Sequence, residues 1–142
     1  MKGKIKNILL IVLSLMSLEI CAQEREFYGK VYNADYDVFI DMNLYEESVA
    51  IPGQDVLGKV FGYLKKNGDS RVWIIMSVRF SEDGRRATLE MVNDYGSDDL
   101  VATLSIETDG SYILKQEEGS NIKVAGRGKW IKLPKVLAFK RK

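Results

Sequence analysis

Histidine is absent from this chain of 142 residues, and cysteine occurs only once, as Cys21. A chain with no imidazole, and no thiol beyond that position, can form neither a Ser-His-Asp nor a Cys-His nucleophile system. It also cannot build a zinc site from His and Cys. Acid–base chemistry near neutral pH is left to carboxylates, lysines and tyrosines. These absences argue against an enzyme, and we predict neither a cofactor nor a metal ion.

Carboxylates are the remaining catalytic option, as in a carboxylate-dependent hydrolase. Asp37 and Asp41 would point from one face of a predicted strand, about 13 Å apart by the strand rise. Glycosidases place their two carboxyl groups roughly 5 to 10 Å apart, so hydrolysis is the least favoured function. The acidic segment 93–99 lacks the spacing of an EF-hand, and we interpret it as an Asx-type turn rather than a calcium site.

Long apolar runs are scarce, and the longest extends from Ile8 to Leu18. Three lysines precede this run and Ala22 follows it, which is the layout of a secretory signal peptide. The apolar core is too short to span a membrane as a helix. We expect residues 1–22 to be removed. Residues 23–142 would then form one domain without a transmembrane span, in the periplasm or outside the cell.

Alternation of apolar and polar residues dominates residues 23–142 and predicts an all-β domain. The clearest segments are 36–44, 72–80 and 100–106, each with one apolar face. In the second segment the pattern assigns five residues to the core face: Val72, Ile74, Met76, Val78 and Phe80. Trp73 and Ile75 would then lie on the opposite face.

Tight turns separate the predicted strands. The pairs Asn67-Gly68, Asp83-Gly84 and Asp109-Gly110 tolerate positive φ, which favours short hairpins. Strands are expected near 27–33, 36–45, 59–66, 71–81, 85–93, 100–108, 111–117, 121–125, 129–133 and 135–140. After Pro52-Gly53 we expect a loop, with a single helical turn as the alternative. Together these features predict a small antiparallel up-and-down barrel of about eight to ten strands, and the alternative is a two-layer β-sandwich.

Four stretches resemble a known group of proteins: IPGQDVLGKVFGYL, NDYGSDDL, DGSYIL and KWIKLPKVLAFK. With the short leader ending in Ala-Gln, they are similar to small exported proteins of Bacteroides-type bacteria. Some of those proteins resemble calycin-like barrels, the broad group that includes lipocalins. The resemblance implies a β-barrel but no activity and no functional residue. Where lipocalins open their first strand with Gly-X-Trp, this chain has Tyr28-Gly29-Lys30.

Charge is divided unevenly along the chain. Residues 119–142 contain eight basic residues and no acidic one, whereas residues 23–118 contain ten basic and nineteen acidic residues. One interpretation is that the basic end packs beside an acidic strand of the same domain. The other is a contact with a polyanion or a partner, such as lipid phosphate or an acidic glycan, through Lys129, Lys132, Lys140, Arg141 and Lys142. In an exported protein we expect no nucleic acid.

The aromatic residues also have two interpretations. Packing in the core and on sheet surfaces accounts for most such residues. Amphipathic rings around a pocket, however, bind small apolar molecules or stack on sugar rings. Tyr28, Tyr32 and Trp73 are the ligand contacts that we predict if a pocket exists.

The leading functional hypothesis is a noncatalytic exported binding module of the cell envelope. It would hold a small apolar or glycan ligand in or on a β-barrel. The alternative is a protein-interaction or structural component of the envelope. That component would meet a protein partner through a sheet edge or the basic C-terminal segment.

The residues around Cys21 provide a test of the leader. Ile20 stands where a lipobox has Gly or Ala, whereas Ile20 and Ala22 together form an ordinary cleavage site. We therefore predict that the exported protein begins at Gln23 and carries no lipid. Intact-mass spectrometry of the protein recovered from an expressing bacterium should give the mass of residues 23–142. A mass that fits a lipidated chain beginning at Cys21 would contradict this prediction.

Overall fold

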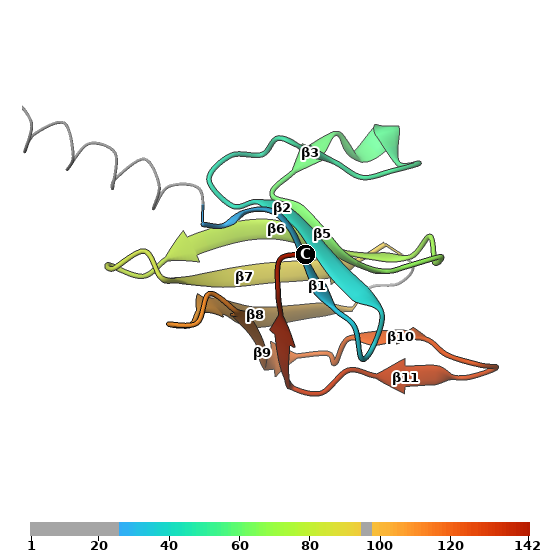
Figure 1. The fold of residues 1–142 in the computed structure, drawn as a ribbon. Helices are drawn as coiled ribbons and strands as arrows, with labels where there is room; N and C mark the ends of the chain where they lie inside the picture. Colours follow the sequence, from blue (N-terminus) through green and yellow to red (C-terminus); the bar gives the residue numbers. More distant parts are fainter. Residues whose placement is uncertain (1–25, 95–97) are drawn as a thin grey trace, which may run out of the picture.

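The computed structural model describes residues 26–94 and 98–142, which form an antiparallel β-barrel (Figure 1). Its eight strands are neighbours in the order β1-β2-β5-β6-β7-β8-β9-β12. They are β1 (Tyr28–Asn33), β2 (Val38–Asn43), β5 (Gly62–Lys66), β6 (Val72–Phe80), β7 (Arg86–Asn93), β8 (Asp99–Ile106), β9 (Tyr112–Gly119) and β12 (Val136–Phe139). The predicted barrel is therefore confirmed, in place of the sandwich. The leader and its cleavage site lie outside the described residues.

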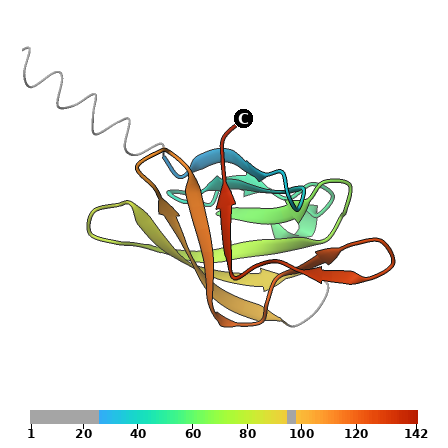
Figure 2. The same cartoon turned by 60° about the horizontal axis from the view of Figure 1, so that its bottom comes forward.

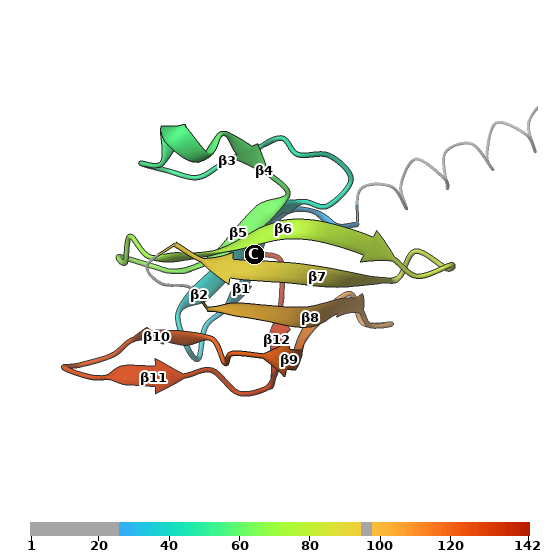
Figure 3. The same ribbon diagram turned by 180° about the vertical axis from the view of Figure 1, so that it is seen from behind.

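Two excursions interrupt the up-and-down order of the barrel. Between β2 and β5, the chain forms a flap from β3 (Val49–Ala50), the 3-10 turn η1 (Asp55–Leu57) and β4 (Lys59–Val60). Between β9 and β12, it forms a hairpin from β10 (Lys123–Ala125) and β11 (Trp130–Lys132). Figure 3 shows the flap and the hairpin on opposite sides of the barrel, and Figure 2 shows the hairpin projecting beyond it. After Pro52-Gly53 the chain thus has the expected loop, and the single helical turn given as the alternative follows it as η1.

The predicted hairpin turns are also present. Gly68, Gly84 and Gly110 have φ angles of 80°, 70° and 85°, which an L-residue with a side chain rarely adopts. They connect β5 to β6, β6 to β7 and β8 to β9. Local turn chemistry therefore specifies the connections between three pairs of consecutive strands.

Apolar side chains from all eight strands meet in the interior of the barrel. Val38, Ile40 and Met42 of β2 point inward, as the alternation of segment 36–44 predicts. The same holds for segment 100–106, where Leu100 and Leu104 are buried in this core. At about 0.8 kcal/mol for each buried methylene group, this burial is the main source of stability in a chain whose residues 23–142 contain no cysteine.

Strand β6 corrects the predicted core face of segment 72–80. A β-bulge at Met76 adds one residue to this strand in its pairing with β7. Trp73 and Ile75 point into the core before the bulge, and Val78 packs against the core after it. Because an inserted residue shifts the side-chain alternation by one, the predicted face is wrong for the first half of the strand. Met76 itself is 52% exposed.

A second apolar cluster lies on the outside of the barrel, where the flap covers β2, β5 and β6. Its buried members are Phe39, Ile51, Val60, Tyr63, Val72 and Ile74. Val72 and Ile74 are two of the residues that alternation assigned to the interior. The flap explains how both faces of β6 can be apolar, because each face of the strand packs against a different cluster.

A short seam between β1 and β12 closes the barrel. Tyr32 and Lys140 form an isolated bridge across it, in which each backbone N–H donates to the carbonyl of the other residue at 2.7 and 2.8 Å. Asn33 Nδ2 donates to the Ala138 carbonyl at 2.8 Å, and Asn33 Oδ1 accepts from the Tyr36 N–H at 2.9 Å. The seam therefore depends on few hydrogen bonds. Asn33 makes one of them, to Ala138, and its bond to Tyr36 holds the turn that follows β1.

Replacing Asn33 tests the contribution of the seam. Asn33→Ala leaves the Ala138 carbonyl and the Tyr36 N–H without these partners, and we expect it to lower the free energy of unfolding by about 2 kcal/mol. Asn67→Ala is the control, because the Asn67 amide makes an exposed bond to Asp37, and its cost should stay below about 1 kcal/mol. Urea unfolding measures both values. Equal losses in the two variants would contradict the assigned role of the seam.

Candidate functional site

The outer side of the seam gathers aromatic rings and ammonium groups. Alternation along β1 turns three side chains away from the interior, on the face opposite to buried Val31. The C-terminal end runs beside β1 and adds two lysines to this surface (Figure 2). We call this set the seam face: Tyr28, Lys30, Tyr32, Lys140 and Lys142.

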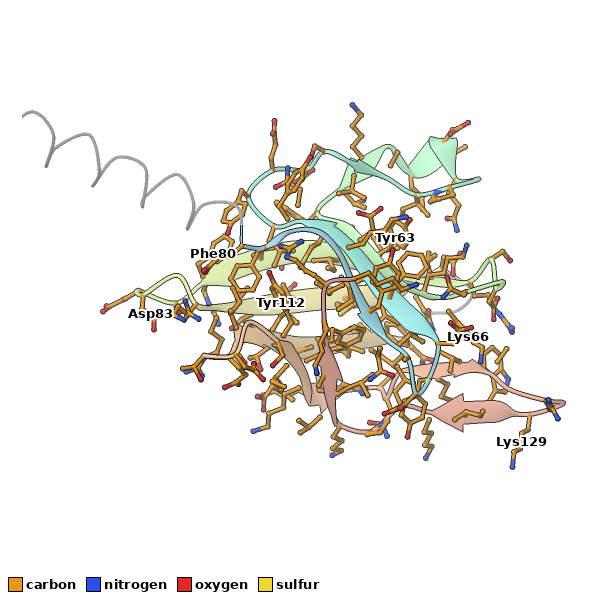
Figure 4. All side chains as sticks on the ribbon, viewed as in Figure 1. Tyr63, Lys66, Phe80, Asp83, Tyr112 and Lys129 are labelled. Carbon is orange, nitrogen blue, oxygen red and sulfur yellow. The ribbon has the colours of Figure 1, made fainter. Side chains whose placement is uncertain are left out.

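Cations and rings are stacked on the seam face. Lys142 Nζ lies 4.4 Å from the centroid of the Tyr32 ring, and Lys30 Nζ lies 5.3 Å from that of Phe39. Both distances are within the roughly 6 Å range of cation–π attraction. The centroids of Tyr32 and Phe39 are 6.0 Å apart, and those of Phe39 and Tyr63 are also 6.0 Å apart. Tyr63, labelled in Figure 4, thereby connects the seam face to the cluster under the flap.

Asp41 is the acidic neighbour of this surface. The strand register places it opposite Lys30 on one side and Tyr63 on the other. Burial raises the pKa of the Asp41 carboxyl, and the charge of Lys30 and a hydrogen bond from Tyr63 offset only part of this effect. The pKa of Tyr63 is raised as well, first by burial and then by the charge of Asp41.

A second carboxylate lies within electrostatic reach of the seam face. Hydrogen bonds from Ser111 hold the pKa of Asp109 below its usual value, and the charge of Lys140 lowers it a little further. Both carboxylates therefore respond to a lysine of the seam face. The charge of that face is partly balanced but remains positive.

The structure brings together two sets of residues that the sequence treated separately. Tyr32, one of the predicted ligand contacts, lies beside Lys140 and Lys142 from the predicted polyanion contacts, and Tyr28 lies further along the same face of β1. Tyr28 is 56% exposed, so its ring is accessible from solvent. Lys30 was missed, although its position between two tyrosines in the alternating pattern Tyr-X-Lys-X-Tyr was visible in the sequence.

Trp73 and Arg141 lie away from the accessible part of this face. Trp73 is 3% exposed in the core, and its indole nitrogen has no hydrogen-bond partner among the described residues. Arg141 Nη2 donates to the Glu26 carbonyl at 2.8 Å and to the Tyr112 hydroxyl at 2.9 Å. Arg141 therefore fastens the C-terminal end to the start of the barrel.

The other two predicted polyanion contacts, Lys129 and Lys132, lie on the β10–β11 hairpin and are exposed. The hairpin is a two-stranded sheet of its own, separate from the barrel sheet. The five basic residues that the sequence grouped together thus belong to three places. Lys129 and Lys132 lie on the hairpin, Lys140 and Lys142 lie on the seam face, and Arg141 bonds to Glu26 and Tyr112.

Comparison with known proteins adds no functional assignment, because no family model, curated protein or solved structure matches this chain. In residues 26–94 and 98–142, no group of three metal-ligating side chains is close enough to hold an ion. The acidic turn 93–99 lies partly outside the described residues. Within the same ranges, no helix is long and apolar enough to cross a membrane.

The raised pKa of Asp41 predicts a pH-dependent effect on stability. Above its usual value of 3.8 the unfolded chain ionises freely, whereas the folded chain must ionise a partly buried group. Ionised Asp41 therefore destabilises the fold near pH 7. We expect Asp41→Asn to raise the free energy of unfolding at pH 7, and this gain should shrink toward zero as the pH falls below 3.8.

Asp109→Asn is the matched control, because its predicted effect has the opposite sign. The stability that ionised Asp109 provides is present above pH 3.8 and lost as the pH falls through its lower folded pKa. This variant should be less stable than the parent protein at pH 7. Urea unfolding at several pH values measures both variants, and a destabilised Asp41→Asn at pH 7 would contradict the assignment.

Proposed function

We propose that this protein is a noncatalytic binding module and that its seam face binds an acidic glycan. The observation that carries the proposal is the alignment of lysine ammonium groups with aromatic rings on the outside of the barrel, with Lys142 on Tyr32 as the closest pair. A ligand can therefore stack on an aromatic ring and pair with an ammonium group at adjacent positions. An envelope location outside the cytoplasm, as the leader predicts, belongs to the same proposal.

The combination of groups favours an acidic glycan over simpler ligands. Tyrosine rings stack on the apolar faces of sugars, and their hydroxyls bond to sugar hydroxyls. Such rings alone would suit a neutral glycan, and lysines alone would suit any polyanion. Tyr28 and Tyr32 beside Lys30, Lys140 and Lys142 serve both the sugar ring and its carboxylate or sulfate.

An apolar ligand inside the barrel is less well supported. Core side chains from every strand occupy the interior, among them Leu64, Leu89 and Leu114. A ligand there would have to displace close-packed groups, each of which stabilises the fold. The outer surface requires no such rearrangement. The four sequence stretches quoted above and the barrel fold also support a kinship with calycin-like barrels, which we propose without carrying over any function.

Binding of polygalacturonate, with neutral dextran as the comparison, tests the proposal. The protein should bind polygalacturonate at low ionic strength, and added salt should weaken the binding because exposed charges are screened. The triple variant Lys30→Gln, Lys140→Gln, Lys142→Gln should bind at least about tenfold more weakly. Isothermal titration calorimetry measures the affinities.

Two further variants separate the contributions of charge and rings. Lys59→Gln, Arg86→Gln, Lys135→Gln removes the same charge from exposed positions elsewhere and should bind like the parent protein. Tyr32→Ala should weaken binding at every salt concentration, because stacking is not screened. The proposal fails if polygalacturonate does not bind at low salt, or if the control triple variant loses as much affinity as the seam-face variant.

A further inference from the structure

The side of the barrel opposite the seam carries a groove of about 370 Å³. Strand β7 is four positions from β1 in either direction around the sheet, so the groove on β6–β9 and the seam face lie on opposite sides. The floor of the groove is apolar and includes Met76, Val92 and Val101. Its rim carries Glu90, Asp99 and Glu118, and all three are exposed. We call this feature the acidic groove.

Irregularities within the strands shape the acidic groove. The bulge in β6 turns Met76 outward, and a second irregularity shifts the β8–β9 register after Val101. Gly119 has a φ of 92°, and a Cβ there would lie 2.5 Å from the Asp99 carbonyl, so β9 and β8 approach closely at this point. Bulges bend a sheet locally and increase its twist. The groove is therefore built into the sheet framework.

The chemistry of the acidic groove selects a cation with an apolar stem. Ion pairs are seen between Arg71 and Asp69, Arg85 and Glu26, and Lys115 and Glu117, and none of these includes a rim carboxylate. Three carboxylates from β7, β8 and β9 surround an apolar floor. Arginine and lysine side chains combine a charged head with an apolar stem, so they fit both parts of the groove.

The same chain presents such cations on the β10–β11 hairpin. Its tip, residues 126–129, has the sequence Gly-Arg-Gly-Lys, and Arg127 and Lys129 are exposed. Two glycines leave the tip narrow, and it projects away from the barrel with Lys129 near its end (Figure 4). The two strands of the hairpin are held against the barrel, because Val124 packs in the core and the ring centroid of Trp130, the residue after the tip, lies 4.3 Å from the Arg71 guanidinium carbon.

We propose that the acidic groove of one copy of this protein receives the hairpin tip of a second copy. The hairpin does not line the groove of its own molecule, whose lining residues come from β6–β9. Because each copy presents one groove and one tip, the contact is heterologous and continues head to tail. The seam face takes no part in this contact, so the inference is independent of the proposed glycan binding.

Two complementary variants test this arrangement by sedimentation velocity. The groove variant is Glu90→Gln, Asp99→Asn, Glu118→Gln, and the hairpin variant is Arg127→Gln, Lys129→Gln. At low ionic strength the parent protein should form species larger than dimers as its concentration rises, and salt should dissociate them. Each variant alone should associate at least about tenfold more weakly.

Mixing the two variants gives the most diagnostic result. The groove variant keeps a functional tip and the hairpin variant keeps a functional groove, so an equimolar mixture should form a heterodimer and nothing longer. Lys59→Gln, Lys135→Gln makes the same charge change as the hairpin variant and should associate like the parent protein. Urea unfolding shows whether each variant keeps the parent stability, and Glu90→Gln alone replaces the groove variant if it does not.

Several outcomes would overturn the proposal. The parent protein could stay monomeric at high concentration and low salt, or the mixture could form no heterodimer. Association of the hairpin variant at the parent strength would exclude the tip as the occupant. Binding of an Arg- and Lys-containing peptide to a monomeric parent protein would assign the acidic groove to a different cationic partner.

Discussion

Closure of the barrel depends on the bridge between Tyr32 and Lys140. An open sheet of eight strands would expose two edges, and the bridge joins the first edge strand, β1, to the residue that follows the last one, β12. The same bridge brings the lysines of the C-terminal end beside the aromatic side chains of β1. The interaction that completes the fold therefore also assembles the seam face, and loss of the bridge would separate the lysines of the C-terminal end from the rings of β1.

Local signals made much of the fold predictable. Alternation identified the strands, and Asn-Gly and Asp-Gly pairs identified three hairpins, because both signals act between residues close in sequence. The bulge at Met76 was not predictable, since the residues before and after it each keep a regular alternation. The flap over Val72 and Ile74 was missed for a related reason, because an outer apolar face gives the same pattern as an inner one.

The candidate site was predictable only in pieces. The sequence identified each of four residues of the seam face: Tyr28, Tyr32, Lys140 and Lys142. Their grouping depends on a contact between the first strand and the C-terminal end of the chain, which no local pattern encodes. Trp73 was assigned to the ligand contacts because aromatic residue type does not distinguish a buried ring from an exposed one. Its place in the core follows from the bulge three residues later.

The fold also explains why the basic end of the chain keeps its charge. Strand β12 has the sequence Val-Leu-Ala-Phe, so it brings no cation into its pairing with β9. The basic residues instead lie before and after β12, on the hairpin and at the C-terminal end, and carboxylates such as Asp109 beside Lys140 balance only part of their charge. If both proposals hold, head-to-tail association would place many seam faces on one assembly. A glycan chain bound at several of them would gain affinity through effective concentration, without any new contact on a single copy.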